Sequence, residues 1–242
     1  MSSANGYTPS LSASQEAPEV IFFDLWRTLV LSHNKRPIHA LQVMLGHRVI
    51  GPGGCPCDEP DPRLLRLCDT VNISDPVRFL QHAAGTVGVW HVTDEAVNGF
   101  LELLQQERNC CAQYKDVLPT LKALKERGYR LGLISNAWPF PVEQIFFVDG
   151  LAEYFEHLVF SFEVGHIKPE PEIFEEACRR FGVEPGRCLM VGDSVEADIK
   201  GALNAGMKAA LIDRPGEVTE QIPGVRKMRS LTELLEILPS KT

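Results

Sequence analysis

The sequence predicts an α/β protein built on a doubly wound parallel sheet. Short unbroken apolar runs that are rich in β-branched and aromatic residues, such as residues 20–23, are typical of strands buried on both faces. From Asp116 onward such runs alternate with helical segments, and this alternation is typical of βαβ units. Functional residues of doubly wound sheets gather where the strands end, and polar residues follow several of the apolar runs.

The elements of this predicted sheet follow from the apolar runs and from the residues that end them. Residues 20–23 form the first strand, and the later predicted strands are 129–134, 157–160, 187–191 and 208–212. Predicted helices are 118–127, 141–148, 171–181, 195–204 and 231–237. Pro171 opens one of these helices and Gly182 ends it, because proline fits a first helical turn and glycine stops a last one.

Residues 32–114 interrupt this alternation and read as a helical insertion, predicted to be a cap. Glycines and prolines in 51–56 and 58–62 divide it into a first helix and a later bundle. Residues 19–31 and 115–242 then form the α/β core, and the Ser- and Ala-rich residues 1–18 are expected to be a disordered tail. Apolar residues recur at helical spacing at Leu41, Leu45 and Val49, at Leu64, Leu65 and Cys68, and at Phe100, Leu103 and Leu104.

Composition narrows the class of protein. The 242 residues are 44% hydrophobic and 23% charged, which suits one well-cored domain with a sizeable insertion, or two small domains. A formal net charge of −8 disfavours nonspecific binding to nucleic acid or to an anionic membrane, and no apolar run approaches the ~18 residues of a membrane span. Seven irregularly spaced cysteines suit reduced thiols, and the first 18 residues lack the features of a targeting signal. We expect a cytoplasmic monomer or homodimer.

Polar residues follow four of the predicted strands and are the candidate site residues. Because the carboxyl ends of parallel strands meet at one edge of a sheet, these residues are expected to lie close together. They are Asp24, with Thr28 four residues later, then Ser135 and Asn136, then Lys168, and finally Asp193, with Asp198 five residues beyond it.

This ordered set, spread over about 175 residues, resembles the four motifs of the haloacid dehalogenase superfamily. Asp24 and Thr28 fit the first motif, Ser135 the second, Lys168 the third, and Gly192-Asp193 with Asp198 the fourth. The resemblance implies the strand order 5-4-1-2-3. It also implies that the helical insertion is a mobile cap that closes over the site, the alternative being a second helical domain that only packs against the first.

The same resemblance implies a hydrolase that acts on a small anionic substrate, most simply a phosphorylated metabolite. Phosphoryl transfer to a carboxylate needs positive charge to screen the repulsion between nucleophile and substrate, and the catalytic Lys168 and a bound metal would supply it. By this resemblance Asp24 would be the nucleophile. Mg²⁺ would be held by Asp24, by the main-chain carbonyl of Trp26 and by Asp193, with Asp198 near the metal. Residues implied to hold the phosphoryl oxygens are Thr28, Ser135, Asn136 and Lys168.

Trp26 departs from the family pattern. Phosphatases of the superfamily carry a second Asp at this position as general acid and base. Indole neither donates nor accepts a proton at neutral pH, so Trp26 removes an acid–base contribution of roughly 10²- to 10⁴-fold. A slow phosphatase, an enzyme for a different leaving group, or a protein without catalysis would each follow.

Two alternatives therefore stand beside the phosphatase. Dehalogenases of the superfamily carry Tyr at the position of Trp26 and use no metal, since halide leaves without a proton. In such an enzyme Arg27, Arg36 or Arg48 could bind the carboxylate or the halide, the alternative being that each is a surface or helix-face residue. The second alternative is a phosphate-binding or regulatory protein with little or no turnover. The Gly192-Asp193-Ser194 sequence with Asp198 favours the metal-binding phosphatase form.

Overall fold

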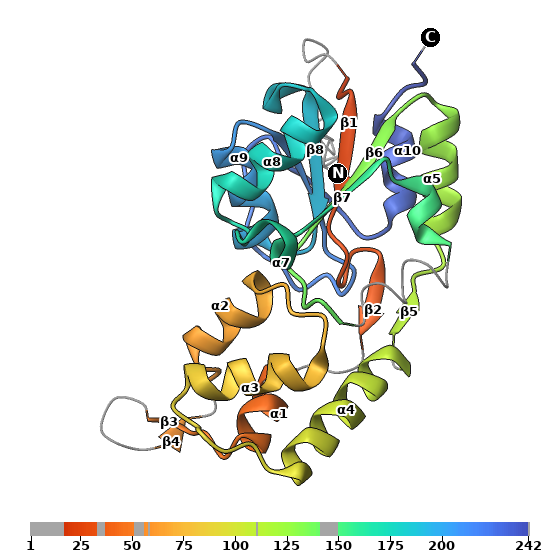
Figure 1. Ribbon diagram of the computed structural model, residues 1–242. Helices are drawn as coiled ribbons and strands as arrows, with labels where there is room; N and C mark the ends of the chain where they lie inside the picture. The colour runs from red at the N-terminus through yellow and green to blue at the C-terminus, as the bar shows by residue number, and fades with distance from the viewer. Residues whose placement is uncertain are drawn as a thin grey trace, which may run out of the picture.

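The computed structural model describes residues 17–32, 37–50, 56–57, 59–109, 111–140 and 150–241. The predicted helix 141–148 and nearly all of the predicted tail 1–18 lie outside these residues, as does Arg36. In the described part, a parallel sheet with helices on both faces stands above a separate unit of helices (Figure 1). No described helix combines the length and the apolar character needed to cross a bilayer.

The main sheet has six parallel strands in the order β10-β9-β8-β1-β6-β7. This confirms the expected order 5-4-1-2-3 and adds one strand, β10, at the edge beside β9. The strands are β1 (Val20–Phe23), β6 (Arg130–Ser135), β7 (His157–Phe160), β8 (Cys188–Gly192), β9 (Lys208–Ile212) and β10 (Arg226–Met228).

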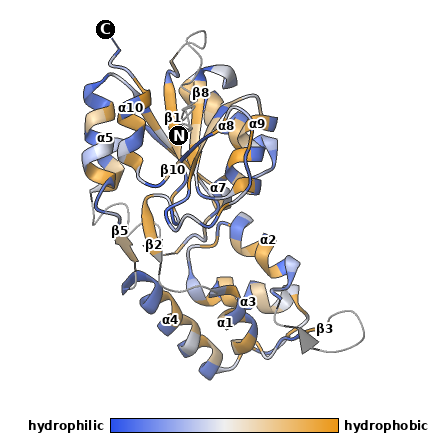
Figure 2. Cartoon of the chain, turned by 180° about the vertical axis from the view of Figure 1, so that it is seen from behind, coloured by the Kyte–Doolittle hydropathy of each residue, from blue (hydrophilic) through white to orange (hydrophobic). Residues whose placement is uncertain are grey.

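Both faces of the sheet are covered, as the unbroken apolar runs predict. On one face lie α5 (Val117–Glu126) and α10 (Leu234–Ile237), and on the other lie α8 (Pro171–Phe181) and α9 (Gly201–Asn204) (Figure 1). The fully buried side chains of β1 alternate between these layers, with Ile21 and Phe23 in the core of α5 and α10 and Val20 and Phe22 in the core of α8. In Figure 2 the central strands β1 and β8 are accordingly apolar.

Several predicted elements differ in detail from the observed ones. Residues 195–204 were expected as one regular helix, but a π-type turn, η3 (Val195–Lys200), precedes α9. The final predicted helix is a 3-10 turn, η4 (Leu231–Glu233), followed by α10. Further short pieces are η1 (Leu151–Tyr154), α7 (Ser161–Val164) and η2 (Pro185–Arg187).

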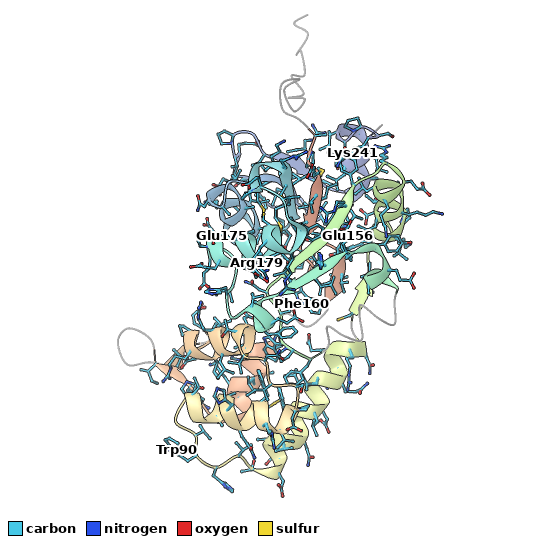
Figure 3. All side chains as sticks on the ribbon, turned by 45° about the horizontal axis from the view of Figure 1, so that its top comes forward. Trp90, Glu156, Phe160, Glu175, Arg179 and Lys241 are labelled. Atoms are coloured by element: carbon cyan, nitrogen blue, oxygen red, sulfur yellow. The ribbon has the colours of Figure 1, made fainter. Side chains whose placement is uncertain are left out.

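The helical unit has a hydrophobic core of its own, to which all four of its helices contribute. Its helices are α1 (Pro37–Met44), α2 (Pro62–Thr70), α3 (Pro76–Thr86) and α4 (Asp94–Asn109). Asp61 and Asp75 cap α2 and α3, each directly before a proline in the first turn. Trp90, which is 90% exposed, marks the end of this unit farthest from the sheet (Figure 3).

Val49 corrects one expectation about this unit. It was predicted on the face of the first helix, but α1 ends at Met44 and Gly46 follows with a φ of 63°. Val49 belongs instead to the short strand β3 (Val49–Ile50), which pairs with β4 (Pro56–Cys57). Glycine adopts a positive φ without the steric cost of a side chain, so the chain turns out of the helix there.

The two units are joined where the chain crosses between them. Strand β2 (Val30–Ser32) leaves the core and β5 (Cys111–Gln113) returns to it, and the two pair antiparallel. The helical unit also contacts the core through α2, whose Arg66 forms an ion pair with Glu170. Both connections lie near the carboxyl edge of the sheet.

Candidate active site

Strand register brings the candidate residues to one edge of the sheet. Phe23 at the end of β1 is level with Leu133 on one side and Val191 on the other. Asp24 is therefore flanked by the ends of β6, whose last residue is Ser135, and of β8, which is followed by Asp193. The predicted convergence at the carboxyl edge follows from this geometry.

Lys168 is the centre of the buried part of this site. Its Nζ donates to Asp24 Oδ1 at 2.7 Å, to Asp198 Oδ1 at 2.6 Å and to the carbonyl oxygen of Ile134 at 2.9 Å. These bonds use all three donors of the ammonium group. The lysine and both carboxylates are buried, so the site is a desolvated ion network and not a surface pair.

Asn136 positions this lysine. Its Oδ1 accepts from the Lys168 backbone N–H at 2.8 Å, and its Nδ2 donates to the Lys168 carbonyl at 3.1 Å. The two residues are 32 positions apart and belong to different loops, so sequence patterns do not reveal the contact. The Asn136 side chain thus holds both backbone polar groups of Lys168, and the predicted phosphate contact of Asn136 stays a prediction.

Asp198 reaches the network because of the π-type turn and of Gly192. Its Oδ2 accepts from the Ser194 backbone N–H at 2.9 Å, while its Oδ1 is held by Lys168. A Cβ atom on Gly192 would overlap the Asp198 carboxylate. The glycine that precedes Asp193 is thus required by the close approach of a side chain, and not by an unusual backbone angle.

Asp24, Asp193 and Asp198 lie around one buried ammonium group, and the pKa values of Asp24 and Asp193 are raised. Burial raises the pKa of Asp24 to about 7, and the charges of Asp198 and Asp193 act in the same direction against Lys168. Burial also raises the pKa of Asp193 to about 6. For Lys168, burial alone would lower the pKa, but the charges of Asp198 and Asp24 outweigh it and raise the pKa.

Arg27 pairs with Asp193 at the mouth of the site, with Nε 3.1 Å from Oδ2. Its backbone has a φ of 61°, a conformation that is uncommon for a residue with a side chain. Its side chain is 67% exposed, so the guanidinium faces solvent as well as Asp193. Of the other arginines considered for an anion, Arg48 is exposed and does not line the cavity described below.

Thr28 and Ser135 are fully buried and do not line that cavity. Ser135 Oγ donates to the carbonyl oxygen of Asn136 at 3.3 Å. Thr28 Oγ1 has no hydrogen-bond partner within the described part of the chain, and the Thr28 carbonyl accepts from Arg214. The phosphate-binding roles of both residues stay predictions.

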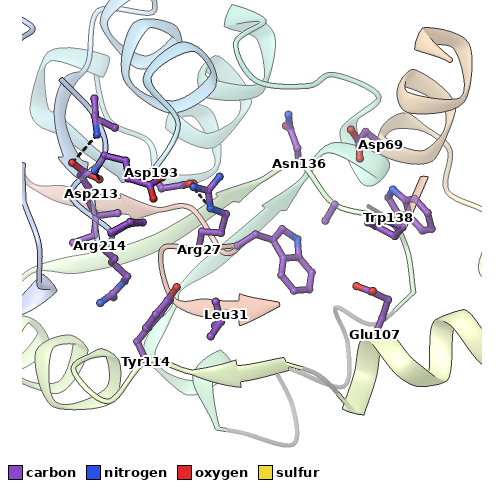
Figure 4. A pocket seen from close by; sticks show the side chains of 17 residues that line it. Arg27, Leu31, Asp69, Glu107, Tyr114, Asn136, Trp138, Asp193, Asp213 and Arg214 are labelled. Carbon is purple, nitrogen blue, oxygen red and sulfur yellow. Dashed lines mark hydrogen bonds and ion pairs between the residues drawn. The ribbon is translucent and has the colours of Figure 1, made fainter. Parts of the chain in front are cut away.

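A cavity of about 730 Å³ opens in front of the network (Figure 4). Trp26, Asn136 and Asp193 line it from the core, and Asp69 of α2 and Glu107 of α4 line it from the helical unit. The remaining wall includes residues that sequence analysis did not identify, because no motif marks them: Tyr114, Trp138 and Arg214. The guanidinium carbon of Arg214 lies 3.7 Å from the ring centre of Tyr114 and is committed to that contact.

The donor set of the network suits a divalent cation. Asp24, Asp193 and Asp198 each offer a carboxylate oxygen, and these oxygens lie within 4.8 Å of one another. Carboxylate oxygens are the ligands that Mg²⁺ prefers in proteins. Burial raises the pKa values of Asp24 and Asp193, and a bound cation would favour the charged form of both carboxylates.

A protein-family model matches this chain, and individual known proteins are similar to parts of it. The model of the haloacid dehalogenase-like hydrolases matches residues 74–206, more than half of the chain. A glyceraldehyde 3-phosphate phosphatase of Methanothermobacter thermautotrophicus is 44% identical over 107 residues, which are 44% of this chain and 46% of that protein. Matches to this relative and to two further phosphatases each span less than half of the relative's length.

Solved structures resemble the chain over nearly its whole length. A HAD phosphatase from Thermococcus onnurineus is 28% identical with a TM-score of 0.62, covering 92% of this chain and 99% of that one. A 2-haloacid dehalogenase from Pseudomonas syringae pv. Tomato is 25% identical with a TM-score of 0.63, covering 91% and 97%. The fold is therefore shared with both kinds of enzyme that the sequence motifs suggest.

Proposed function

This chain belongs to the haloacid dehalogenase-like hydrolases, and from that premise we propose that it is a Mg²⁺-dependent phosphatase-type enzyme for a small phosphorylated metabolite. The observation that carries the proposal is the network of Asp24, Lys168, Asp193 and Asp198 behind an open cavity. A nucleophile, a buried cation and a donor set for a metal thus occupy one edge of the sheet. The relatives named as phosphatases support the same reaction class.

Asp24 is the nucleophile in this proposal. Its Oδ1 is held by Lys168, so its Oδ2 attacks the phosphorus atom and an aspartyl phosphate forms. Water then attacks the phosphorus atom, and Asp24 leaves as a carboxylate. Lys168 orients Asp24 throughout and contributes positive charge against the phosphoryl oxygens.

Asp24, Asp193 and the main-chain carbonyl of Trp26 would hold Mg²⁺, with Asp198 beside them. When bound, Mg²⁺ supplies positive charge that screens the repulsion between Asp24 and the phosphoryl group. A backbone carbonyl can be a metal ligand whatever side chain its residue carries. Trp26 therefore leaves the metal site chemically possible. Trp26 does remove the proton donor of the first motif, and acid–base catalysis from that motif is impaired.

The helical unit acts as the cap of this enzyme. Asp69 and Glu107 bring two of its helices to the wall of the cavity, and the paired strands β2 and β5 lie where the chain leaves the core and where it returns. Rigid-body motion about these crossings would open and close the cavity. Cap residues would then select the part of the substrate that carries the phosphoryl group.

A second candidate function is 2-haloacid dehalogenation. Trp26 favours it, because a halide ion departs without a proton. The likeness to the Pseudomonas dehalogenase is compatible with it. The cluster of three carboxylates argues against it, since an enzyme without a metal has no evident use for two further acids beside Asp24.

Assays of purified protein with phosphate monoesters and short 2-haloacids, each with Mg²⁺ and with EDTA, separate these candidates. We expect phosphate release that requires Mg²⁺, and no halide release. Metal-independent halide release would show that the protein is a dehalogenase and not a phosphatase. Tight phosphate binding without release of phosphate or halide would indicate a phosphate-binding protein without catalytic activity.

Metal binding is expected at the carboxylate cluster in the absence of any substrate. Isothermal titration calorimetry with Mg²⁺ should give binding to the wild type that is weakened at least about tenfold in Asp24→Asn and in Asp193→Asn, because each removes a charged oxygen ligand. Asp94→Asn is the matched control, since Asp94 is an exposed acid at the start of α4 that does not line the cavity. Equal affinity in all four proteins would contradict the assignment of the site.

A further inference from the structure

Trp26 leaves the first motif without a proton donor, and Asp193, the motif carboxylate on the core side of the cavity, is assigned to the metal site. Departure of an alkoxide is slow unless its oxygen is protonated as the bond to phosphorus breaks. The two carboxylates that the helical unit contributes to the cavity wall, Asp69 and Glu107, are therefore candidate donors. They lie across from the core residues, where a leaving group would face them (Figure 4).

Asp69 is held over the site by the helix that carries it. Arg66, one turn earlier on α2, forms an ion pair with Glu170, which lies two residues after Lys168. The same loop therefore bears the lysine of the network and the anchor of α2. Residues three positions apart lie on the same side of a helix, so the contact that anchors Arg66 also turns Asp69 toward the core.

The Asp69 carboxyl has no structural role in holding together the described part of the fold. It takes part in no hydrogen bond or ion pair within the part of the chain that the structure describes, although it is only partly exposed. Figure 4 shows it at the cavity on the side of Asn136, the residue that holds Lys168. A carboxyl group that caps no helix and pairs with no base is available to a ligand.

Burial also gives Asp69 the proton affinity that a donor needs. It raises the pKa of Asp69 to about 7, while the charge of Lys168, which is felt at this position, acts in the opposite direction. A general acid works best when its pKa lies near the operating pH, because it then carries a proton and still releases it readily.

We propose that Asp69 is the general acid of this enzyme, protonating the leaving oxygen from the cap in place of the carboxylate that Trp26 replaces. The inference rests on the proposed phosphatase function and assigns a further catalytic residue to it. It also gives a chemical reason for cap closure, since Asp69 meets the leaving oxygen only while α2 remains docked on the core.

As Asp24 Oδ2 bonds to phosphorus, the bond from phosphorus to the leaving oxygen breaks and its electron pair stays on that oxygen. The Asp69 proton moves to the same oxygen, giving an alcohol and the Asp69 carboxylate. In the second step water attacks the phosphorus atom and gives its proton to Asp69, while Asp24 departs with the electron pair of its bond to phosphorus.

The test compares Asp69→Asn with wild type on two substrates, nitrophenyl phosphate and an alkyl phosphate. Nitrophenolate departs with little protonation, whereas an alkoxide depends on it. We expect kcat for the alkyl phosphate to fall by roughly 10²-fold and kcat for nitrophenyl phosphate to fall by less than about tenfold. Adding Trp26→Asp to Asp69→Asn should restore turnover of the alkyl phosphate selectively, since it returns a carboxyl group to the core side.

Several outcomes would overturn the inference. One is an equal loss on both substrates, because that indicates binding or folding and not protonation. Another is a changed substrate ratio in Glu107→Gln with none in Asp69→Asn, which would assign the proton to the other cap acid. Asp94→Asn, outside the cavity, should behave as wild type on both substrates. Absence of phosphate release from wild type overturns the proposed function itself, whereas release that is insensitive to Asp69→Asn overturns only the role of Asp69.

Discussion

Asp24→Asn is expected to reduce phosphate release to the level of the assay blank, a loss of at least about 10³-fold in kcat. The amide that replaces the carboxylate is a poor nucleophile, and no other carboxylate follows β1 at this edge of the sheet. Lys168 keeps its bond to Asp198 in the variant, so the network loses one acid without leaving a buried ammonium unpaired. The variant should therefore fold.

Two measurements make this result interpretable. The melting temperature of Asp24→Asn should lie within a few degrees of the wild-type value, because one of three crowded carboxylates has been removed. Mass spectrometry must exclude deamidation back to Asp. Full activity in a variant that passes both checks would assign the nucleophile to another residue.

Lys168→Met is expected to have the largest effect on stability. It leaves Asp24 and Asp198 buried without the ammonium group that holds both, and it removes the donor to the Ile134 carbonyl. Breaking a buried ion pair by removing one partner costs about 3–5 kcal/mol, since the remaining charge is neither solvated nor paired. We expect the free energy of unfolding in urea to fall by about this amount, and activity to be lost.

Lys200→Met is the matched control for this substitution. Lys200 pairs with Glu196 one helical turn away and with Glu220, but its side chain is 40% exposed and water screens both pairs. Its replacement should leave the urea midpoint nearly unchanged. If Lys168→Met unfolds at the same urea concentration as Lys200→Met, the buried network does not stabilise the fold.

The sequence alone was sufficient for the core of the fold because burial on both faces leaves a clear pattern. Val20–Phe23 is an apolar run and Lys208–Ile212 is apolar after its first residue, and the structure has strands with these same bounds. Strand β10 could not be predicted, since only Met228 of its three residues is buried. The turn at Val195–Lys200 has the composition of an ordinary helix, and its wider π form accompanies the inward position of Asp198.

The candidate site likewise has some features that the sequence predicts and others that it does not. Asp24, Lys168 and Asp193 follow predicted strands in the order of known motifs, so their convergence could be anticipated from the topology. The clamp of Asn136 on Lys168 and the pairing of Arg27 with Asp193 are tertiary contacts without a sequence signature. The position of Asp69 depends on how α2 docks on the core, which no local pattern of the insertion encodes.

The proposed chemistry makes one intermediate central, a phosphoryl group bound to Asp24. Wild-type protein mixed with a phosphate monoester and Mg²⁺, quenched in acid within one turnover and digested, should yield the peptide that contains Asp24 with the added mass of a phosphoryl group. The same peptide from Asp24→Asn should be unmodified. Rapid phosphate release with no modified peptide at any quench time, or with the phosphoryl group on a different residue, would contradict the account.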